Sequence, residues 1–226
     1  MQRAFVPVML LSAWAGLAGG AAQAGAWPRE AGETFLSFGG IVALSEEDGA
    51  LSRIDPTIYL EYGLTERLTL GLDGYAADDG GSGNLFGWAR LPLATGANGD
   101  VAAISAGAGA VLVDEDDTEA AARLGLHWGR GIEEGWLSID AQALLALSSL
   151  SHEAKIDATW GQSLSPRWTG MLQGQVGYGL DGDAYAKLGA SAVLHVAPDL
   201  DLRIGLSRAI TGDPDAGLSV ETWWRF

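Results

Sequence analysis

Apolar and polar residues alternate along most of this chain with a period close to two. In the final segment, the apolar series is Leu218, Val220, Thr222, Trp224 and Phe226. The residues between them are Ser219, Glu221, Trp223 and Arg225. Successive side chains of a β-strand point to opposite faces, so this pattern predicts strands with one apolar and one polar face.

Turn-forming residues divide the chain at intervals that suit strands crossing a bilayer at a tilt. We predict strands near residues 33–44, 55–64, 68–76, 85–93, 101–112, 119–129, 135–146, 153–163, 168–179, 184–196, 200–211 and 218–226. This makes about twelve strands, with ten or fourteen as alternatives; an even number puts both termini on one side, as in single-chain bacterial barrels. The expected fold is all-β, a transmembrane antiparallel up-and-down β-barrel over residues 25–226.

The placement of charge favours a membrane barrel over a soluble β-sandwich or a lipocalin-like barrel. A soluble barrel turns its bulky apolar residues inward, whereas a barrel in lipid turns them outward and keeps its polar face towards the lumen. Here the apolar face is nearly free of charge over many strands, and the polar face carries acids and bases among Gly and Ser. We expect the lumen to be lined by Glu61, Asp73, Arg90, Arg123, Asp140, Lys155, Asp157, Lys187, Arg203 and Glu221.

Acids and bases are balanced on this inner face, which leaves two interpretations open. The charges line a wet channel, or they pair across the lumen and plug it, because an unpaired charge in a dry interior is costly. Our first hypothesis is a narrow passive channel or transporter for a small solute, with the inward charges as lining and selectivity groups. The second is a non-conducting structural or adhesion barrel.

The N-terminus has the features of a secretory signal peptide. Arg3 precedes an apolar stretch, and Ala22-Gln23-Ala24 is a small-x-small cleavage site. A membrane anchor is the alternative, but the apolar stretch is short for a span. We therefore expect residues 1–24 to be removed, and the mature protein to lie in the outer membrane of a Gram-negative bacterium, in contact with lipid and lipopolysaccharide.

Aromatic residues gather towards the predicted strand ends, as in the interfacial girdles of membrane barrels. They are Trp128, Trp136, Trp160, Trp168, Trp224 and Phe226.

The C-terminal segment, which ends in Trp224, Arg225 and Phe226, resembles the terminal strand signal of bacterial outer-membrane barrels. The resemblance implies recognition by the barrel-assembly machinery, with Trp224 and Phe226 as signal residues. The segment 62–70 resembles the tight hairpin of an outer-membrane group described as phenol-degradation meta-pathway transporters, and 164–168 and 196–202 resemble variants of it. That resemblance implies passive uptake of small molecules, hydrophobic ones included.

The net charge of −16 disfavours nucleic acid as a partner, since phosphates require Lys and Arg. Acids concentrate in predicted outer loops, for example Asp114 to Asp117 and Asp181 with Asp183. These loops are either simply solvated or a rim that loosely binds Ca²⁺ or Mg²⁺ beside lipopolysaccharide. We predict no other cofactor.

An enzymatic role has weak support in the sequence. Cys is absent, and His127, His152 and His195 are the three histidines of the chain. A serine hydrolase needs a base beside its nucleophile, but no lipase-type signature surrounds any of these histidines. We expect no enzyme, with an outer-leaflet lipid-modifying enzyme as the minor alternative.

Overall fold

The computed structural model describes residues 25–44, 51–77, 82–96, 99–114, 117–211 and 216–226. Within these ranges the chain forms twelve strands. They are β1 (Thr34–Leu44), β2 (Leu51–Thr65), β3 (Leu68–Ala76), β4 (Gly83–Thr95), β5 (Asp100–Asp114), β6 (Asp117–Ile132), β7 (Gly135–Ala146), β8 (His152–Ser165), β9 (Trp168–Tyr178), β10 (Ala184–Ala197), β11 (Leu200–Thr211) and β12 (Ala216–Arg225).

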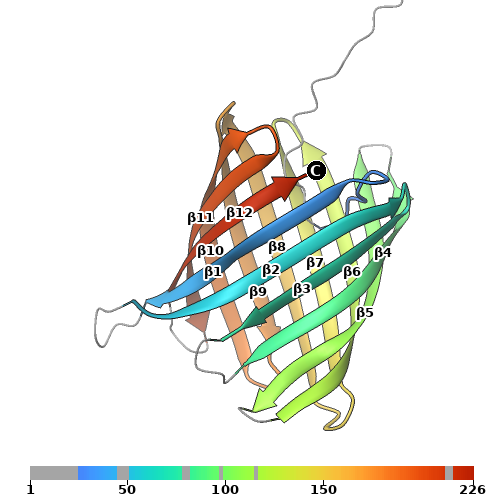
Figure 1. The fold of residues 1–226 in the computed structure, drawn as a ribbon, viewed down its shortest axis with the longest axis vertical. Helices are drawn as coiled ribbons and strands as arrows, with labels where there is room; N and C mark the ends of the chain where they lie inside the picture. Colours follow the sequence, from blue (N-terminus) through green and yellow to red (C-terminus); the bar gives the residue numbers. More distant parts are fainter. Residues whose placement is uncertain (1–24, 45–50, 78–81, 97–98, 115–116, 212–215) are drawn as a thin grey trace, which may run out of the picture.

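The strands form one closed antiparallel barrel, in which each strand pairs with its neighbours in the chain (Figure 1). Pairing of β1 with β12 closes the ring, from Phe35 opposite Arg225 to Leu44 opposite Ala216. The predicted all-β up-and-down barrel and its strand number are confirmed. Several strands are longer than predicted: β2 starts at Leu51, and β6 ends at Ile132. Backbone pairing continues there beyond the apolar alternation, because ladder hydrogen bonds do not require apolar side chains.

The two ends of the barrel differ in their connections. Turns of two residues at 66–67, 133–134, 166–167 and 198–199 lie at the end where β1 begins and β12 ends, which we call the terminal end. Longer connections such as 147–151 and 179–183 lie at the opposite, loop end. Bacterial barrels have short turns on the periplasmic side and longer loops outside the cell. By this rule the terminal end corresponds to the periplasmic end of bacterial barrels.

The outer wall of the barrel is apolar. Large exposed apolar side chains include Leu124, Leu126, Ile156, Leu172, Leu188 and Leu206. They alternate with buried or half-buried inward residues along each strand. A soluble barrel would bury such side chains. The apolar side chains therefore face outward, as expected for a barrel in lipid. Among the described residues, no helix is long and apolar enough to cross a membrane.

Of the six aromatic residues predicted for the girdle, three are exposed on the outer wall and one lies inside the barrel. Trp160, Trp168 and Phe226 are exposed on the outer wall. The prediction for Trp136 is wrong, because its side chain is buried inside the barrel. Trp136 and Asp140 are four positions apart on β7, so they lie on the same face of the strand and both point inward.

Two apolar clusters occupy part of the lumen, and the sequence analysis did not predict them. One contains Phe35, Trp136, Met171, Val193 and Trp223, with Trp27 and Tyr59 packed against it. The other contains Phe86, Val111, Ala121, Leu144 and Ala146, with Trp88 and Leu180. Inward glycines make room for the indoles: a β carbon on Gly71 would overlap the Trp88 ring, and one on Gly161 would overlap the Trp136 ring.

Candidate functional site in the barrel lumen

Ion pairs between strands that are not neighbours show which side chains point into the lumen. Arg123 of β6 donates two hydrogen bonds to Asp73 of β3, one of them of 2.9 Å from Nη1 to Oδ2. The Trp88 indole N–H of β4 donates to the same carboxylate at 2.6 Å. Because β3 and β6 are not hydrogen-bonded to each other, their side chains meet through the interior of the barrel.

A second network surrounds Arg203. Its guanidinium donates to Glu221 of β12 at 2.8 Å and to Gln173 of β9 at 2.5 Å. Glu221 also accepts hydrogen bonds from Ser37 of β1 at 3.2 Å and from the Trp223 indole at 3.0 Å. Charge-assisted hydrogen bonds of this kind are roughly twice as strong as neutral ones. The network therefore ties together the strands on both sides of the β1–β12 closure.

Glu61, whose side chain is fully buried, lies at the centre of a third network. Its carboxylate pairs with Arg29 at 2.5 Å and with Arg90 at 2.8 Å, and it accepts a hydrogen bond from the Tyr59 hydroxyl at 2.6 Å. Arg29, which precedes β1, was missed by the sequence analysis. It lies before the first predicted strand, where alternation does not indicate direction. The signal that could have found it is a single base directly before Glu30 and Glu33.

Asp140, Asp157 and Lys155 lie on the wall formed by β7 and β8. Asp140 is directly opposite Asp157 in the strand register. Asp157 accepts a hydrogen bond from Gln175 at 2.5 Å, and Lys155 lies 3.9 Å from it. The side chains of Lys155 and Asp157 are 29% and 31% exposed, whereas that of Glu61 is fully buried. Accessible charge therefore lies towards the loop end of these strands.

Lys187 of β10 lies 5.3 Å from the centre of the Tyr185 ring on the same face. Lys187 is exposed, and among the residues that the structure describes no other contact places it in the networks described above. Several of the ten charged residues predicted from the sequence pair with one another, as in Arg123–Asp73, Arg203–Glu221 and Arg90–Glu61. Their role in selecting a solute stays a prediction.

Residues 25–33, which we call the N-terminal segment, enter the lumen at the terminal end. Ala26 is 1% exposed, and the Trp27 carbonyl accepts a hydrogen bond of 2.9 Å from Arg90. The Arg29 amide donates to Thr69 at 3.1 Å. Backbone hydrogen bonds from the Gly63 amide to the Glu33 carbonyl and from the Gly32 amide to the Gly63 carbonyl anchor the end of the segment on β2. The segment thus narrows the terminal mouth, a feature that the sequence analysis did not predict.

Two of the three histidines take part in relays on the inner face. Ser105 Oγ lies 2.8 Å from His127 Nε2, and His127 Nδ1 lies 2.7 Å from Asp140. Similarly, His195 lies 3.0 Å from Thr169 and 2.8 Å from Asp201. His152 instead contacts the Tyr178 ring edge-on near the loop end.

The Ser105 relay has the connectivity of a hydrolase triad, but its surroundings differ. A hydrolase needs N–H donors directed at the developing oxyanion. Ser105 lies within continuous ladders between Arg90 of β4 and Gly125 of β6, so the neighbouring backbone N–H groups are used by the sheet. The relay also faces the lumen rather than the outer leaflet. We interpret it as a structural tie between β5, β6 and β7.

Most of the acidic residues of the predicted cation-binding rim lie outside the described residues. These are Glu46, Glu47, Asp48, Asp78, Asp79, Glu115, Asp116, Asp213 and Asp215. Within the described part of the chain, no group of three His, Asp or Glu side chains is arranged to hold a metal ion. Loose binding of Ca²⁺ or Mg²⁺ stays a prediction.

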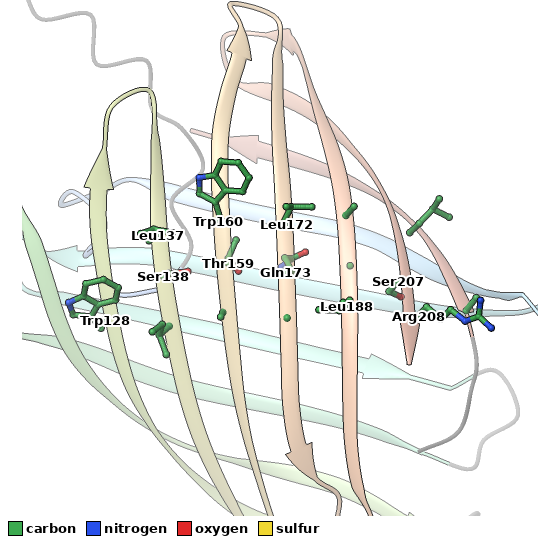
Figure 2. A pocket seen from close by; sticks show the side chains of 17 residues that line it. Trp128, Leu137, Ser138, Thr159, Trp160, Leu172, Gln173, Leu188, Ser207 and Arg208 are labelled. Atoms are coloured by element: carbon green, nitrogen blue, oxygen red, sulfur yellow. The ribbon is translucent and has the colours of Figure 1, made fainter. Parts of the chain in front are cut away.

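Figure 2 shows a hollow lined by residues of strands β6 to β12. Its large side chains, including Trp160, Leu172 and Leu188, belong to the exposed outer wall. Small residues such as Ala158 and Ala190 lie between them. The large apolar side chains of the hollow therefore belong to the outer surface of the barrel.

Comparisons with known proteins identify the fold. No protein-family model and no curated protein sequence matches the chain. The structure is similar to the KdgM porin (TM-score 0.60, 8% identity, 85% of this chain and 99% of that chain). It is also similar to a COG4313 outer-membrane channel from Pseudomonas putida F1 (TM-score 0.56, 13% identity, 90% and 99%). The outer-membrane phospholipase A from Escherichia coli has a related barrel (TM-score 0.54, 10% identity, 88% and 97%).

At these identities the likeness shows the fold alone. The chain has the barrel architecture of bacterial outer-membrane proteins, as expected from its alternating pattern and terminal strand. The resemblance to the meta-pathway transporter group is not confirmed.

Proposed function

We propose that the protein is a narrow passive channel for a small solute in the outer membrane of a Gram-negative bacterium. The observation that carries this proposal is the change in exposure along the inner face. Charged side chains are buried around Glu61 near the terminal end, but Lys155 and Asp157 are partly exposed nearer the loop end. Such a lumen is more open along β8 near the loop end, is packed on the β4–β7 side by the cluster that contains Phe86, and is narrowed at the terminal end by the N-terminal segment.

The composition of the inner wall suggests the class of solute. Apolar side chains such as Phe86 and Trp88 lie near Arg123, whose guanidinium is 4.4 Å from the Phe86 ring centre. Phe86 is fully buried and packs against the Arg123 guanidinium, whereas Trp88 and Arg123 are partly exposed, so a small solute with both a charged group and an apolar face would contact these two. One neighbour, the KdgM porin, has been solved in complex with oligogalacturonate. The resemblance to the meta-pathway group would extend the range to more hydrophobic molecules.

Single-channel recording in planar bilayers tests the channel proposal. We expect small conductance steps, and we expect Lys187→Glu to shift the reversal potential in a salt gradient towards cation preference. Asp199→Asn, in an exposed turn outside the lumen, is the matched control and should leave the reversal potential unchanged. Large porin-like steps would contradict a narrow lumen.

The N-terminal segment favours one alternative, a non-conducting structural or adhesion barrel. If the refolded protein produces no steps in any salt while remaining fully folded, this alternative replaces the channel. Binding of Ca²⁺ to the acidic loops, measured by calorimetry at millimolar calcium, would then support an adhesive or lipopolysaccharide-bridging surface.

Lipid hydrolysis is the remaining alternative, favoured by the Ser105–His127–Asp140 relay and by the phospholipase A neighbour. We expect no hydrolysis of phospholipid that depends on Ser105 or His127. A fluorogenic phospholipid assay of the wild type, Ser105→Ala and His152→Gln tests this. Activity that disappears in Ser105→Ala and persists in His152→Gln would establish an enzyme.

The proposal includes removal of residues 1–24 as a signal peptide and insertion of the mature chain into the outer membrane. Membrane fractionation should recover the protein in the outer membrane, in agreement with its apolar outer wall and terminal strand. The barrel-assembly machinery and lipopolysaccharide are proposed partners. A protein recovered freely soluble in the periplasm would overturn the location.

A further inference from the structure

The first described residue, Gly25, is buried and lies against an acidic side chain. An ideal β carbon on Gly25 would lie 3.1 Å from both carboxylate oxygens of Asp140. The nitrogen of Gly25 is bonded to the same α carbon, at about 1.5 Å. Because Ser138 also lies within van der Waals range of this position, the start of the N-terminal segment packs on the inner face of β7.

Asp140 lies where negative charge is in excess. It faces Asp157 across the β7–β8 ladder, and the base nearest to Asp157 is 3.9 Å away. One oxygen of Asp140 contacts His127, which is neutral or charged according to its protonation. A carboxylate held inside a barrel is favoured by a nearby cation, because the low local dielectric strengthens the attraction. A positive group beside Asp140 would therefore stabilise this wall.

We propose that signal-peptide cleavage after Ala24 supplies this cation. Hydrolysis of the Ala24–Gly25 peptide bond adds water across it and leaves a free carboxylate on Ala24 and a protonated α-amino group on Gly25. That ammonium group forms an ion pair with Asp140 and fixes the N-terminal segment across the terminal mouth of the lumen. The proposal rests on the proposed processing and deepens the proposed function, since it makes the new N-terminus part of the channel constriction.

The contacts that follow along the segment support the anchor. Trp27 packs against the apolar cluster that contains Trp136, and its carbonyl accepts from Arg90. Arg29 pairs with the buried Glu61. The segment thus carries two positive groups, one at each side of Trp27, and each has a buried or half-buried carboxylate as its partner. An uncleaved chain has a neutral amide at Gly25 and lacks the first of these groups.

Reactivity of the α-amino group tests the ion pair directly. Protein purified from outer membranes is acetylated with a small water-soluble reagent at neutral pH, and the N-terminal peptide is measured by mass spectrometry. We expect this peptide to start at Gly25 and its amine to react about tenfold more slowly in the folded barrel than in urea. In Asp140→Asn the amine should regain most of the tenfold loss in reactivity, whereas in Asp199→Asn it should react as slowly as in the wild type.

A second variant keeps the test valid if Asp140→Asn fails to fold. Insertion of one alanine after Ala24 moves the amine along the chain by up to about 3.5 Å and leaves the barrel unchanged. We expect the shifted amine to react nearly as fast as in urea. A mature chain that starts elsewhere, or an amine equally protected in wild type, Asp140→Asn and the insertion variant, would overturn the proposal.

Conductance separates this inference from the channel proposal. In single-channel recordings, Asp140→Asn and a chain lacking residues 25–31 should each conduct about twofold or more above the wild type, because pore conductance rises as a constriction widens. If no variant conducts, the proposed channel fails, and the amine measurement still decides the ion pair.

Discussion

Arg123 and Asp73 form a bidentate ion pair across the lumen, although they lie on strands β6 and β3, which do not pair with each other. The pair joins parts of the wall that the backbone ladder connects only through β4 and β5. It also holds a carboxylate and a guanidinium, 21% and 13% exposed, inside the barrel. This makes it suited to testing both stability and selectivity.

Removal of Arg123 should expose the charge of Asp73 to the pore. We expect Arg123→Ala to destabilise the barrel by about 1 to 3 kcal/mol, less than a fully buried pair because both partners are partly solvated. It should also shift the reversal potential towards cations. Urea unfolding and recordings in a salt gradient measure the two effects. The double variant Arg123→Gln with Asp73→Asn should return the reversal potential close to wild type, and a shift that persists there would argue against the pair as its source.

Glu61 should contribute more to stability than any exposed carboxylate. In Glu61→Gln, the charges of Arg29 and Arg90 lose their shared buried partner, and we expect a loss of about 3 kcal/mol in the free energy of unfolding. Glu66→Gln, in the exposed turn between β2 and β3, is the control and should change stability by less than about 0.5 kcal/mol. Equal effects of the two substitutions on the urea midpoint would show that the buried network is not a stabilising element.

The alternating pattern was sufficient to predict the barrel, its strand number and the inward direction of residues such as Asp73 and Arg203. Residues an even number of positions apart on a strand point to the same side of the sheet. Because Trp136 is four positions from the inward Asp140, the same rule predicts that Trp136 points inward. The partners of these residues could not be predicted in the same way. Whether Arg123 meets Asp73 depends on barrel curvature and stagger, which no local pattern encodes. Arg29 and Trp27 lie before the first strand, where alternation gives no information about direction.

Gly129 and Gly131 provide a matched test of the N-terminal segment, since they lie on the same face of β6. A β carbon on Gly129 would overlap the Trp27 ring, while one on Gly131 would have no atom within 4 Å. We expect Gly129→Ala to displace Trp27 and to cost about 1 to 3 kcal/mol, as overpacking does. Gly131→Ala should be neutral or stabilising by up to about 1 kcal/mol, because alanine loses less backbone entropy than glycine. Urea unfolding measures both, and similar costs for the two would mean that the segment does not pack on β6.

Phe226 tests whether the terminal strand is an assembly signal. Its backbone exchanges two hydrogen bonds with Thr34, but its ring is 70% exposed and therefore adds little packing to the barrel. We expect Phe226→Ala to refold in detergent as well as the wild type, yet to reach the outer membrane of cells in clearly smaller amounts, measured by heat-modifiable mobility of the folded form. Phe38→Ala removes an equally aromatic, 54% exposed ring from the wall of β1 and serves as the control. A loss in cells that is the same for both variants, or a matching loss during refolding in vitro, would assign the effect to the lipid-facing surface instead of to recognition of the C-terminus.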